Sequence, residues 1–365
     1  MFILFDDNSH VGRFPTFSEH ILSASFNRMP VYSSKDRAPR ILIIKLSSVG
    51  DILHALPTVN ALKRYMNAEI DWVVQREFVD LVDCFPDVNC VIPFPRRGFL
   101  KHGGKFIREL RSHDYHIVID LQGLMKSALI ARLARAPRKI GPSFNREGAH
   151  LFYHEVAGER DLTRHAIDQN LDVLRLLNQD VSDPVFNAVF PEPNPPLSGP
   201  RPWIAMAPCS RWQSKDWPAD SFAKLSEQLL KATGGTIFFM GAPGDREICA
   251  NLQRSVKGNA YNLAGLHTLP ESGGVLRQVD VLVANDSGPA HLGCAAGVPT
   301  VTLFGPTDEN RTGPYGDQHV VIRAEEPCFP CYDRVCKRTA GGCMKTITPD
   351  RVAQAVIKVL KRAES

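Results

Sequence analysis

Residues 47–51, with the sequence SSVGD, are placed to do acid–base chemistry. They follow a short apolar run, ILIIK at 41–45, and precede a segment with apolar residues at helical spacing. This pattern predicts a turn between a buried strand and a helix. Asp51 is there either a helix cap or a general base that accepts a proton from a substrate hydroxyl. Gly50 lets a ligand approach the backbone, and the helix start offers N–H groups.

Residues 285–291, with the sequence NDSGPAH, follow another buried run, VDVLVA, and open a short helix. Small residues at a helix start suit a phosphate, because Ser287 and Gly288 can present backbone N–H groups to it. A plain strand-to-helix turn capped by Asp286 fits the same pattern. The sequence leaves both interpretations open.

Lys215 lies in a third turn, residues 209–218, which also follows a predicted strand. Its ammonium group either offsets the charge of a diphosphate leaving group or belongs to an ordinary exposed loop lysine. A fourth turn, GAPGD at 241–245, follows a strand as well but lacks the full glycine fingerprint of a dinucleotide site. Four such turns favour a ligand site at the strand ends.

Four of the nine cysteines are close together in the sequence, with the spacing C-x2-C-x4-C-x6-C. Thiolates at such spacings can bind a structural zinc ion tetrahedrally, while reduced thiols and disulfides are the alternatives. We expect no catalytic role, because no histidine lies within this loop to activate a thiolate. The four residues are Cys328, Cys331, Cys336 and Cys343.

Apolar runs alternate with helical patterns along most of the chain, which predicts an α/β fold with two Rossmann-like, doubly wound domains facing across a cleft. Six prolines between residues 191 and 202 indicate a spacer between the two domains. We expect an N-terminal extension of unknown role at 1–39, domains at 40–190 and 203–347, and a terminal helix at 348–365. The cysteine-rich loop, 328–343, falls in the second domain.

The composition is that of a soluble globular protein, with 365 residues, 44% hydrophobic and 22% charged. No apolar run reaches the roughly 18 residues of a membrane-spanning helix, and the first residues lack the basic flank of a secretory signal. We therefore expect a cytoplasmic location. Nine cysteines in a chain of this length do not fit a secreted disulfide framework.

Basic residues are concentrated between positions 96 and 146, where twelve Lys and Arg face three acidic residues, a net charge of +9 in a chain of +4 overall. The overall charge is too small to imply nucleic-acid binding by itself. The basic segment is either a solvated helical face or a positive surface for an anionic partner, such as a phosphorylated lipid, an acidic sugar or nucleic acid.

Five ordered segments resemble the glycosyltransferase family 9 heptosyltransferases from about Ile41 to the C-terminus: KLSSVGDILHALP, DWVVQREF, VIDLQGLMKSALIARL, SKDWP and NDSGPAHLGCAAGVPTVTLFGPT. Three of the N-terminal segments, together with REGAHLFY, are most similar to the type I heptosyltransferases of this family. The resemblance implies a GT-B fold in which the first domain binds the acceptor and the second the nucleotide sugar. It also implies inverting transfer of heptose from ADP-heptose to the Kdo of the lipopolysaccharide inner core, carried on lipid A.

The same resemblance implies roles for individual residues. Asp51 is the base and Lys215 the catalytic lysine near the donor diphosphate. The sequence departs from the family at 241–243, where it has GAP in place of the acid that contacts the donor ribose in some members; Asp245 and Glu247 are the candidate substitutes. The implied donor-binding residues are Ser210, Lys215, Gly241, Asp286, Ser287, Gly288 and His291. The implied acceptor-binding residues are Ser48, Gly50, Arg96, Arg97, Gln122, Lys126 and Arg146.

The resemblance implies that catalysis requires no cofactor, in agreement with the absence of a D-x-D triplet from the sequence. It further implies peripheral contact with the anionic cytoplasmic face of the inner membrane and no binding of nucleic acid. Other hypotheses remain: a family 9 transferase of another sugar or acceptor, including heptosyltransferase II; a sugar-nucleotide epimerase; and a zinc-dependent nucleic-acid-binding protein, suggested by the cysteine loop and the basic segment.

Overall fold

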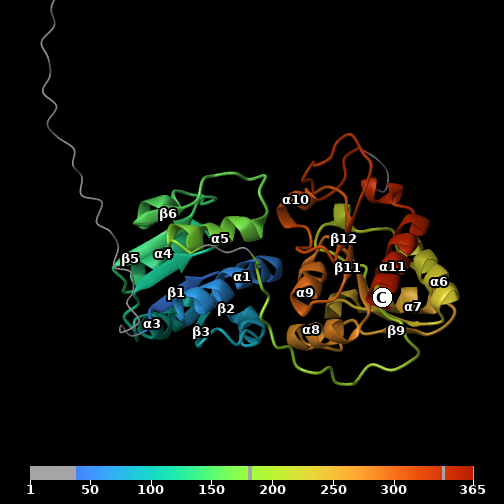
Figure 1. Ribbon diagram of the computed structural model, residues 1–365, viewed down its shortest axis with the longest axis horizontal. Helices are drawn as coiled ribbons and strands as arrows, with labels where there is room; N and C mark the ends of the chain where they lie inside the picture. The colour runs from blue at the N-terminus through green and yellow to red at the C-terminus, as the bar shows by residue number, and fades with distance from the viewer. Residues whose placement is uncertain (1–37, 180–182, 339–341, 365) are drawn as a thin grey trace, which may run out of the picture. The chain divides into compact units, whose positions relative to one another are not determined.

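The computed structural model describes residues 38–179, 183–338 and 342–364. The predicted extension at 1–39 therefore lies outside the described residues, except for its last two. Residues from Ala38 onward belong to one unit that contains two parallel sheets (Figure 1).

The first sheet has six parallel strands in the order β3-β2-β1-β4-β5-β6. Its central strand β1 is wholly apolar after its first residue and is buried on both sides. Ile41 and Ile43 pack with the helices at 49–66 and 166–176, whereas Leu42 and Ile44 pack with the helices at 99–110 and 125–133 on the opposite face. The strands are β1 (Arg40–Ile44), β2 (Glu69–Gln75), β3 (Cys90–Phe94), β4 (Ile117–Asp120), β5 (Arg138–Pro142) and β6 (Glu155–Ala157).

The helices of this first half cover both faces of its sheet. They are α1 (Val49–Met66), α2 (Val79–Val82), α3 (Phe99–Leu110), α4 (Met125–Leu133) and α5 (Ala166–Leu176), with short 3₁₀ helices η1 (Arg76–Phe78) and η2 (Ala149–Phe152). Of the described residues, those from 183 to 202 form no helix or strand, and the second sheet begins directly after them.

The second sheet also has six parallel strands, in the order β12-β11-β10-β7-β8-β9. Ile204 and Met206 of β7 pack with α6 and α11, and Ala205 and Ala207 face α8 and α9. The strands are β7 (Trp203–Ala207), β8 (Thr236–Phe239), β9 (Ala260–Asn262), β10 (Val281–Asn285), β11 (Thr300–Phe304) and β12 (Val320–Arg323).

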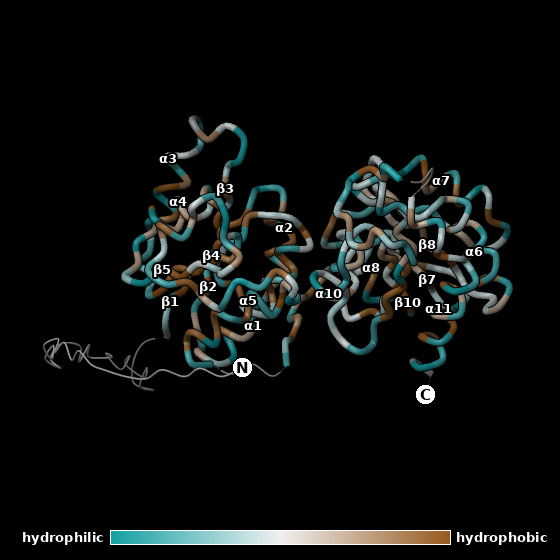
Figure 2. The backbone as a smooth tube through the Cα atoms, turned by 90° about the horizontal axis from the view of Figure 1, so that it is seen from above, coloured by the Kyte–Doolittle hydropathy of each residue, from teal (hydrophilic) through white to brown (hydrophobic). Residues whose placement is uncertain are grey.

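The helices of the second half again lie on both faces of the sheet. They are α6 (Ala219–Thr233), α7 (Arg246–Ser255), α8 (Leu269–Gln278), α9 (Gly288–Ala296), α10 (Glu309–Thr312) and α11 (Pro349–Glu364), with 3₁₀ helices η3 (Gln213–Lys215), η4 (Pro243–Asp245) and η5 (Cys343–Thr346). Figure 2 shows the apolar tube segments concentrated in strands such as β1, β4 and β10, as expected for sheets buried on both faces.

Both sheets have the same doubly wound order, in which the strand succession reverses between β1 and β4 in the first and between β7 and β10 in the second. Ligands of such sheets bind outside the carboxyl ends of the strands at this reversal. The turns 47–51, 121–124, 209–218 and 286–288 follow these four strands. The predicted α/β fold is therefore confirmed, and it gathers the predicted site residues at the expected strand ends.

The first helix begins at Val49, within the turn predicted at 47–51, so the turn before it is shorter than predicted. The chain turns at Gly123, whose φ of 68° is readily available only to glycine, and α4 begins after this turn, at Met125. No helix within the described ranges has both the length and the apolar composition needed to cross a bilayer.

Candidate active site

Asp51 lies exposed in the first turn of α1, directly beyond the end of β1. Its Oδ2 accepts hydrogen bonds from the backbone N–H of Ser48, at 2.9 Å, and from the Ser48 hydroxyl, at 2.7 Å. Ser48, not Asp51, is the N-cap residue, so the predicted capping role is corrected: Asp51 instead closes a capping box from the third helical position. Both hydrogen bonds engage the same oxygen of the carboxylate.

Lys45, to which the sequence analysis gave no role, lies buried behind Asp51. Its Nζ donates to the carbonyl of Leu121 at 2.5 Å, and the residue is only 4% exposed. Burial lowers the pKa of Lys45, while the nearby carboxylates of Asp51 and Asp120 act in the opposite direction. The signal in the sequence was a lysine at the end of an otherwise apolar strand.

Lys215 and Asp286 form an ion pair at the ends of β7 and β10, with Nζ and Oδ2 2.5 Å apart. The same oxygen accepts the hydroxyl of Thr307 at 2.6 Å. Asp286 is 3% exposed, and Ser287 is the N-cap of α9. Asp286 is thus not the helix cap, and Lys215 is not a free loop lysine; Thr307, in the GPT that follows β11, is a member that the sequence analysis missed. We call these three residues the donor cluster, after the role that the resemblance implies for Lys215 and Asp286.

The first turns of α1 and α9 pack against each other. A Cβ added to Gly50 would lie 2.5 Å from Cδ2 of His291, and one added to Gly288 would lie 3.8 Å from Val49. Gly50 was predicted to let a ligand approach the backbone, but the space beside it is filled by the imidazole of His291. This position therefore requires glycine for contact between the two helix starts.

His291 joins residues of both halves. Its Nδ1 is 3.2 Å from Nε2 of His54, and the two rings meet edge to face. Burial lowers the pKa of His291, and the carboxylates of Asp286 and Asp51 partly oppose this effect. The predicted base and the donor cluster therefore both lie within electrostatic reach of one imidazole ring.

The polar groups of Ser210 are engaged within its own turn, and Gly241 lies in a turn that Asp245 closes. Ser210 donates its backbone N–H to Asp216 at 2.8 Å and its hydroxyl to the carbonyl of Trp212 at 2.9 Å. Asp245 accepts the N–H of Ala242 at 2.8 Å and lies directly against Gly241. Asp245 thus closes this turn, whereas Glu247, two residues later, is exposed.

The predicted acceptor residues Arg96, Arg97, Lys126 and Arg146 are all exposed. The Nζ of Lys126 lies 5.5 Å from the centre of the Phe94 ring. Partial burial lowers the pKa of Lys126, and the positive charge of Arg96 lowers it further. These two cations therefore share one patch at the ends of β3 and β4.

Gln122 has a structural task that the prediction did not include. Its Oε1 accepts the backbone N–H groups of Leu46 and Ser47, at 3.0 and 3.2 Å. The side chain thereby fixes the turn that carries Ser48 and Asp51.

None of the nine cysteines, all within the described part of the chain, forms a disulfide. Burial raises the pKa of Cys343 to about 11, with smaller contributions from Cys328, Cys331 and Cys336, so the four thiols are neighbours. Among residues 38–179, 183–338 and 342–364, however, no three His, Cys, Asp or Glu side chains are arranged to hold a metal ion. The zinc site stays a prediction, which metal analysis of protein purified without chelator tests.

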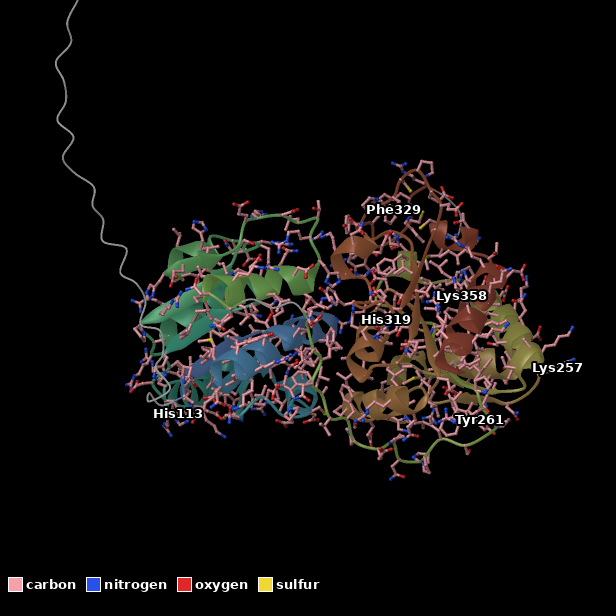
Figure 3. The ribbon with its side chains drawn as sticks, viewed as in Figure 1. His113, Lys257, Tyr261, His319, Phe329 and Lys358 are labelled. Carbon is pink, nitrogen blue, oxygen red and sulfur yellow. The ribbon has the colours of Figure 1, made fainter. Side chains whose placement is uncertain are left out.

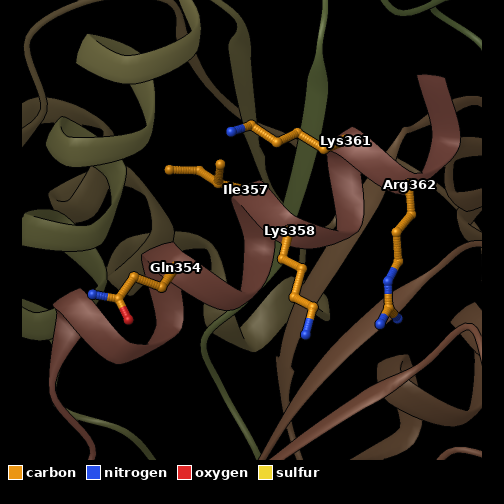
Figure 4. A pocket seen from close by; sticks show the side chains of 5 residues that line it. All are labelled: Gln354, Ile357, Lys358, Lys361 and Arg362. Carbon is orange, nitrogen blue, oxygen red and sulfur yellow. The ribbon is translucent and has the colours of Figure 1, made fainter. Parts of the chain in front are cut away.

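One surface hollow, of about 470 Å³, lies along α11 and is apart from these residues (Figure 4). It is lined by Gln354, Ile357, Lys358, Lys361 and Arg362. It includes none of the predicted site residues, so the strand ends remain the candidate site.

The model of the glycosyltransferase family 9 (heptosyltransferase) matches residues 104–340. Lipopolysaccharide heptosyltransferase 1 of Pseudomonas aeruginosa is 29% identical over 367 residues, which cover 89% of this chain and 99% of that protein. Lipopolysaccharide heptosyltransferase 1 of Escherichia coli K12 is 31% identical over 306 residues, which cover 78% of this chain and 93% of that protein.

Solved structures give a similar picture. E. coli heptosyltransferase WaaC with ADP has a TM-score of 0.73 at 25% identity, over 88% of this chain and 99% of that one. E. coli ADP-heptose lps heptosyltransferase II has a TM-score of 0.74 at 23% identity, over 89% of this chain and 100% of that one, which supports the fold.

Proposed function

Because the chain belongs to glycosyltransferase family 9, the heptosyltransferases, we propose that it transfers heptose from ADP-heptose to the Kdo of the lipopolysaccharide inner core, with inversion at the anomeric carbon. The observation that carries this proposal is the contact between the first turns of α1 and α9, where Gly50, next to Asp51, packs against His291 of the helix that follows Asp286. A base on one sheet and a cation on the other are what a single displacement between two bound substrates requires.

The relatives support ADP-heptose as the donor. WaaC has been solved with ADP and with ADP-2-deoxy-2-fluoro heptose, and this chain is 25% identical to it in each comparison. The donor diphosphate would lie at the ends of β7 and β10, where Lys215 and the first N–H groups of α9 offer positive charge. Asp286 orients Lys215 for that task through their 2.5 Å ion pair.

Asp51 would act as the general base. The acceptor hydroxyl oxygen attacks the anomeric carbon from the face opposite ADP, and the bond between that carbon and the diphosphate oxygen breaks. The hydroxyl proton passes to Asp51. Because Oδ2 of Asp51 already accepts two hydrogen bonds from Ser48, we assign the proton transfer to Oδ1.

Charge develops on the departing diphosphate as the glycosidic bond breaks. Lys215 and the N-terminal N–H groups of α9 would stabilise this charge, and their positions are already fixed by Asp286, Thr307 and the helix itself. Such preorganised groups lower the barrier because they need not reorient during the reaction.

The exposed cations Arg96, Arg97, Lys126 and Arg146 would bind the acceptor, whose Kdo carboxylates and lipid A phosphates are anionic. The same basic segment would attract the protein to the anionic cytoplasmic face of the inner membrane. We propose no nucleic-acid partner.

The test is mass spectrometry of a Kdo-bearing lipid A acceptor after incubation with ADP-heptose and, separately, with UDP- and GDP-sugars. Addition of one heptose from ADP-heptose alone is expected. Addition only to an acceptor that already carries heptose would assign the protein to heptosyltransferase II; lipopolysaccharide heptosyltransferase 2 of Salmonella typhimurium is 29% identical to this chain. Turnover of the nucleotide sugar without acceptor would instead indicate an epimerase.

A further inference from the structure

The cysteine loop, here residues 328–338 with 342 and 343, has no place in the mechanism above. It nevertheless contacts the segments that carry the donor cluster at several separate points. Phe329, labelled in Figure 3, belongs to this loop, and the guanidinium of Arg323 stacks on its ring at 4.6 Å. Its other contacts reach the turn that carries Lys215 and the segment 305–307, which ends at Thr307.

The first contact is made by Ser214, the residue before Lys215. Its backbone N–H donates to the carbonyl of Arg334 at 3.1 Å, and its hydroxyl donates to the carbonyl of Asp333 at 2.6 Å. Ser214 is 6% exposed, so both groups depend on the loop for their partners. The loop thereby fixes the backbone from which the Lys215 side chain extends.

The second contact is on the Thr307 side. The N–H of Tyr332 donates to the carbonyl of Pro306 at 2.9 Å, next to the threonine that donates to Asp286. One residue earlier, Gly305 lies against the end of the loop: an added Cβ would be 2.5 Å from Sδ of Met344 and 2.9 Å from Sγ of Cys343.

The third contact is made at the indole ring of Trp212, which lies close to two cations. Nζ of Lys215 lies 4.7 Å from the centre of the Trp212 ring, and the guanidinium of Arg334 lies 5.4 Å from the same centre. Arg334 of the loop and Lys215 of the donor turn therefore share one aromatic partner. A cavity of about 390 Å³ is lined by residues of both the loop and the turn, among them Val335 and Gln213.

We infer that the cysteine loop positions the donor cluster, and that Ser214 is a positioning residue for Lys215. This inference rests on the proposed role of Lys215 in donor binding. A lysine side chain is flexible, and its ammonium meets a diphosphate reproducibly only if the backbone beneath it is fixed. Hydrogen bonds to loop carbonyls fix that backbone without contacting the substrate.

The experiment measures ADP affinity by calorimetry, and KM for ADP-heptose and for the acceptor separately, in Ser214→Ala. Loss of one hydrogen bond from a buried group is expected to weaken ADP binding and raise the donor KM by about fivefold to tenfold, with the acceptor KM unchanged. Ser214→Thr keeps the hydroxyl and should recover most of the affinity. If Ser214 only stabilised the fold, Ser214→Ala would not raise the donor KM while leaving the acceptor KM unchanged.

Ser226→Ala is the matched control, because this fully buried hydroxyl also donates to a backbone carbonyl, that of Phe222, but lies in α6 away from the donor turn. It should change thermal stability alone. Gly305→Ala disturbs the loop from its other side and should weaken ADP binding as Ser214→Ala does, so the inference does not depend on one variant.

Lys215→Ala separates the two proposals. If Lys215→Ala binds ADP as the wild type does, the donor role of Lys215 is wrong. If Lys215→Ala loses ADP affinity while folded Ser214→Ala and Gly305→Ala retain it, the donor role stands and the positioning role of the loop is overturned. Equal rises in the donor and acceptor KM values of Ser214→Ala would overturn it as well.

Discussion

The two halves present their charged site residues in different ways. In the second half, Lys215, Asp286 and Thr307 are linked to one another and largely buried, with Asp286 only 3% exposed. In the first half, the cations of the proposed acceptor patch, Arg96, Arg97, Lys126 and Arg146, are exposed. A buried, linked cluster suits the proposed donor, which has one fixed shape, whereas exposed flexible cations suit the proposed acceptor, which a lipid surface would present in many orientations.

Asp51 is an exception in the first half, since it is exposed yet held in place by Ser48. Asp51→Asn is expected to lower kcat by about 10²- to 10⁴-fold, because the amide cannot accept the acceptor proton. The asparagine carbonyl can still accept the N–H of Ser48, so helix capping and ADP affinity should be retained. The measurement is kcat beside ADP binding by calorimetry. Turnover close to that of the wild type would remove Asp51 from the role of base.

The buried donor cluster predicts that binding and stability are coupled there. Lys215→Met leaves the Asp286 carboxylate buried without its cation, which should lower the free energy of unfolding by about 3–5 kcal/mol and the ADP affinity by about tenfold or more. Denaturant unfolding and calorimetry measure the two effects.

A double variant distinguishes these two effects of Lys215. Adding Asp286→Asn to Lys215→Met removes the stranded charge, so stability should largely return while ADP affinity stays low. Lys224→Met, at an exposed lysine of α6, should change neither quantity. Recovery of ADP affinity in the double variant would contradict a direct role of Lys215 at the diphosphate.

The histidines between the halves predict a pH-dependent stability. Burial holds the pKa of His54 well below 6.5, with His291, His165 and Lys45 acting in the same direction, and it lowers the pKa of His291 and His165. The unfolded chain therefore binds more protons than the folded chain as the pH falls below about 6.5, and the free energy of unfolding should fall with it.

His54→Asn removes one of these titrating groups, so the decline in unfolding free energy between pH 7.5 and 5 should become shallower. Denaturant unfolding at several pH values measures it. His113→Asn, at an exposed histidine labelled in Figure 3, should leave the profile unchanged. A His54→Asn profile as steep as that of the wild type would show that this group does not titrate on unfolding.

The fold could be predicted because it depends on local patterns: apolar runs such as ILIIK and VDVLVA form central parallel strands, and the turns after them fall at the strand reversals. Contacts between side chains that are distant in the sequence could not be predicted in this way. Nothing near Lys215 in the sequence indicates that its partner is Asp286, 71 positions later, or that His291 fills the space beside Gly50. Lys45 was missed because nothing local indicates that a lysine directly after an apolar strand is buried.

The exposed acceptor patch predicts the smallest effects. Arg96→Ala and Lys126→Ala should each raise the acceptor KM by about twofold to fivefold, since exposed charge pairs contribute little individually, and should leave the donor KM and thermal stability unchanged. The increases should shrink as salt is raised, because screening already weakens these contacts in the wild type. Arg135→Ala removes an exposed charge from the same basic segment, outside the proposed patch, and should leave the acceptor KM unchanged. Equal effects at Arg135 and Arg96 would mean that the acceptor responds to the overall positive charge of this half, not to a defined patch.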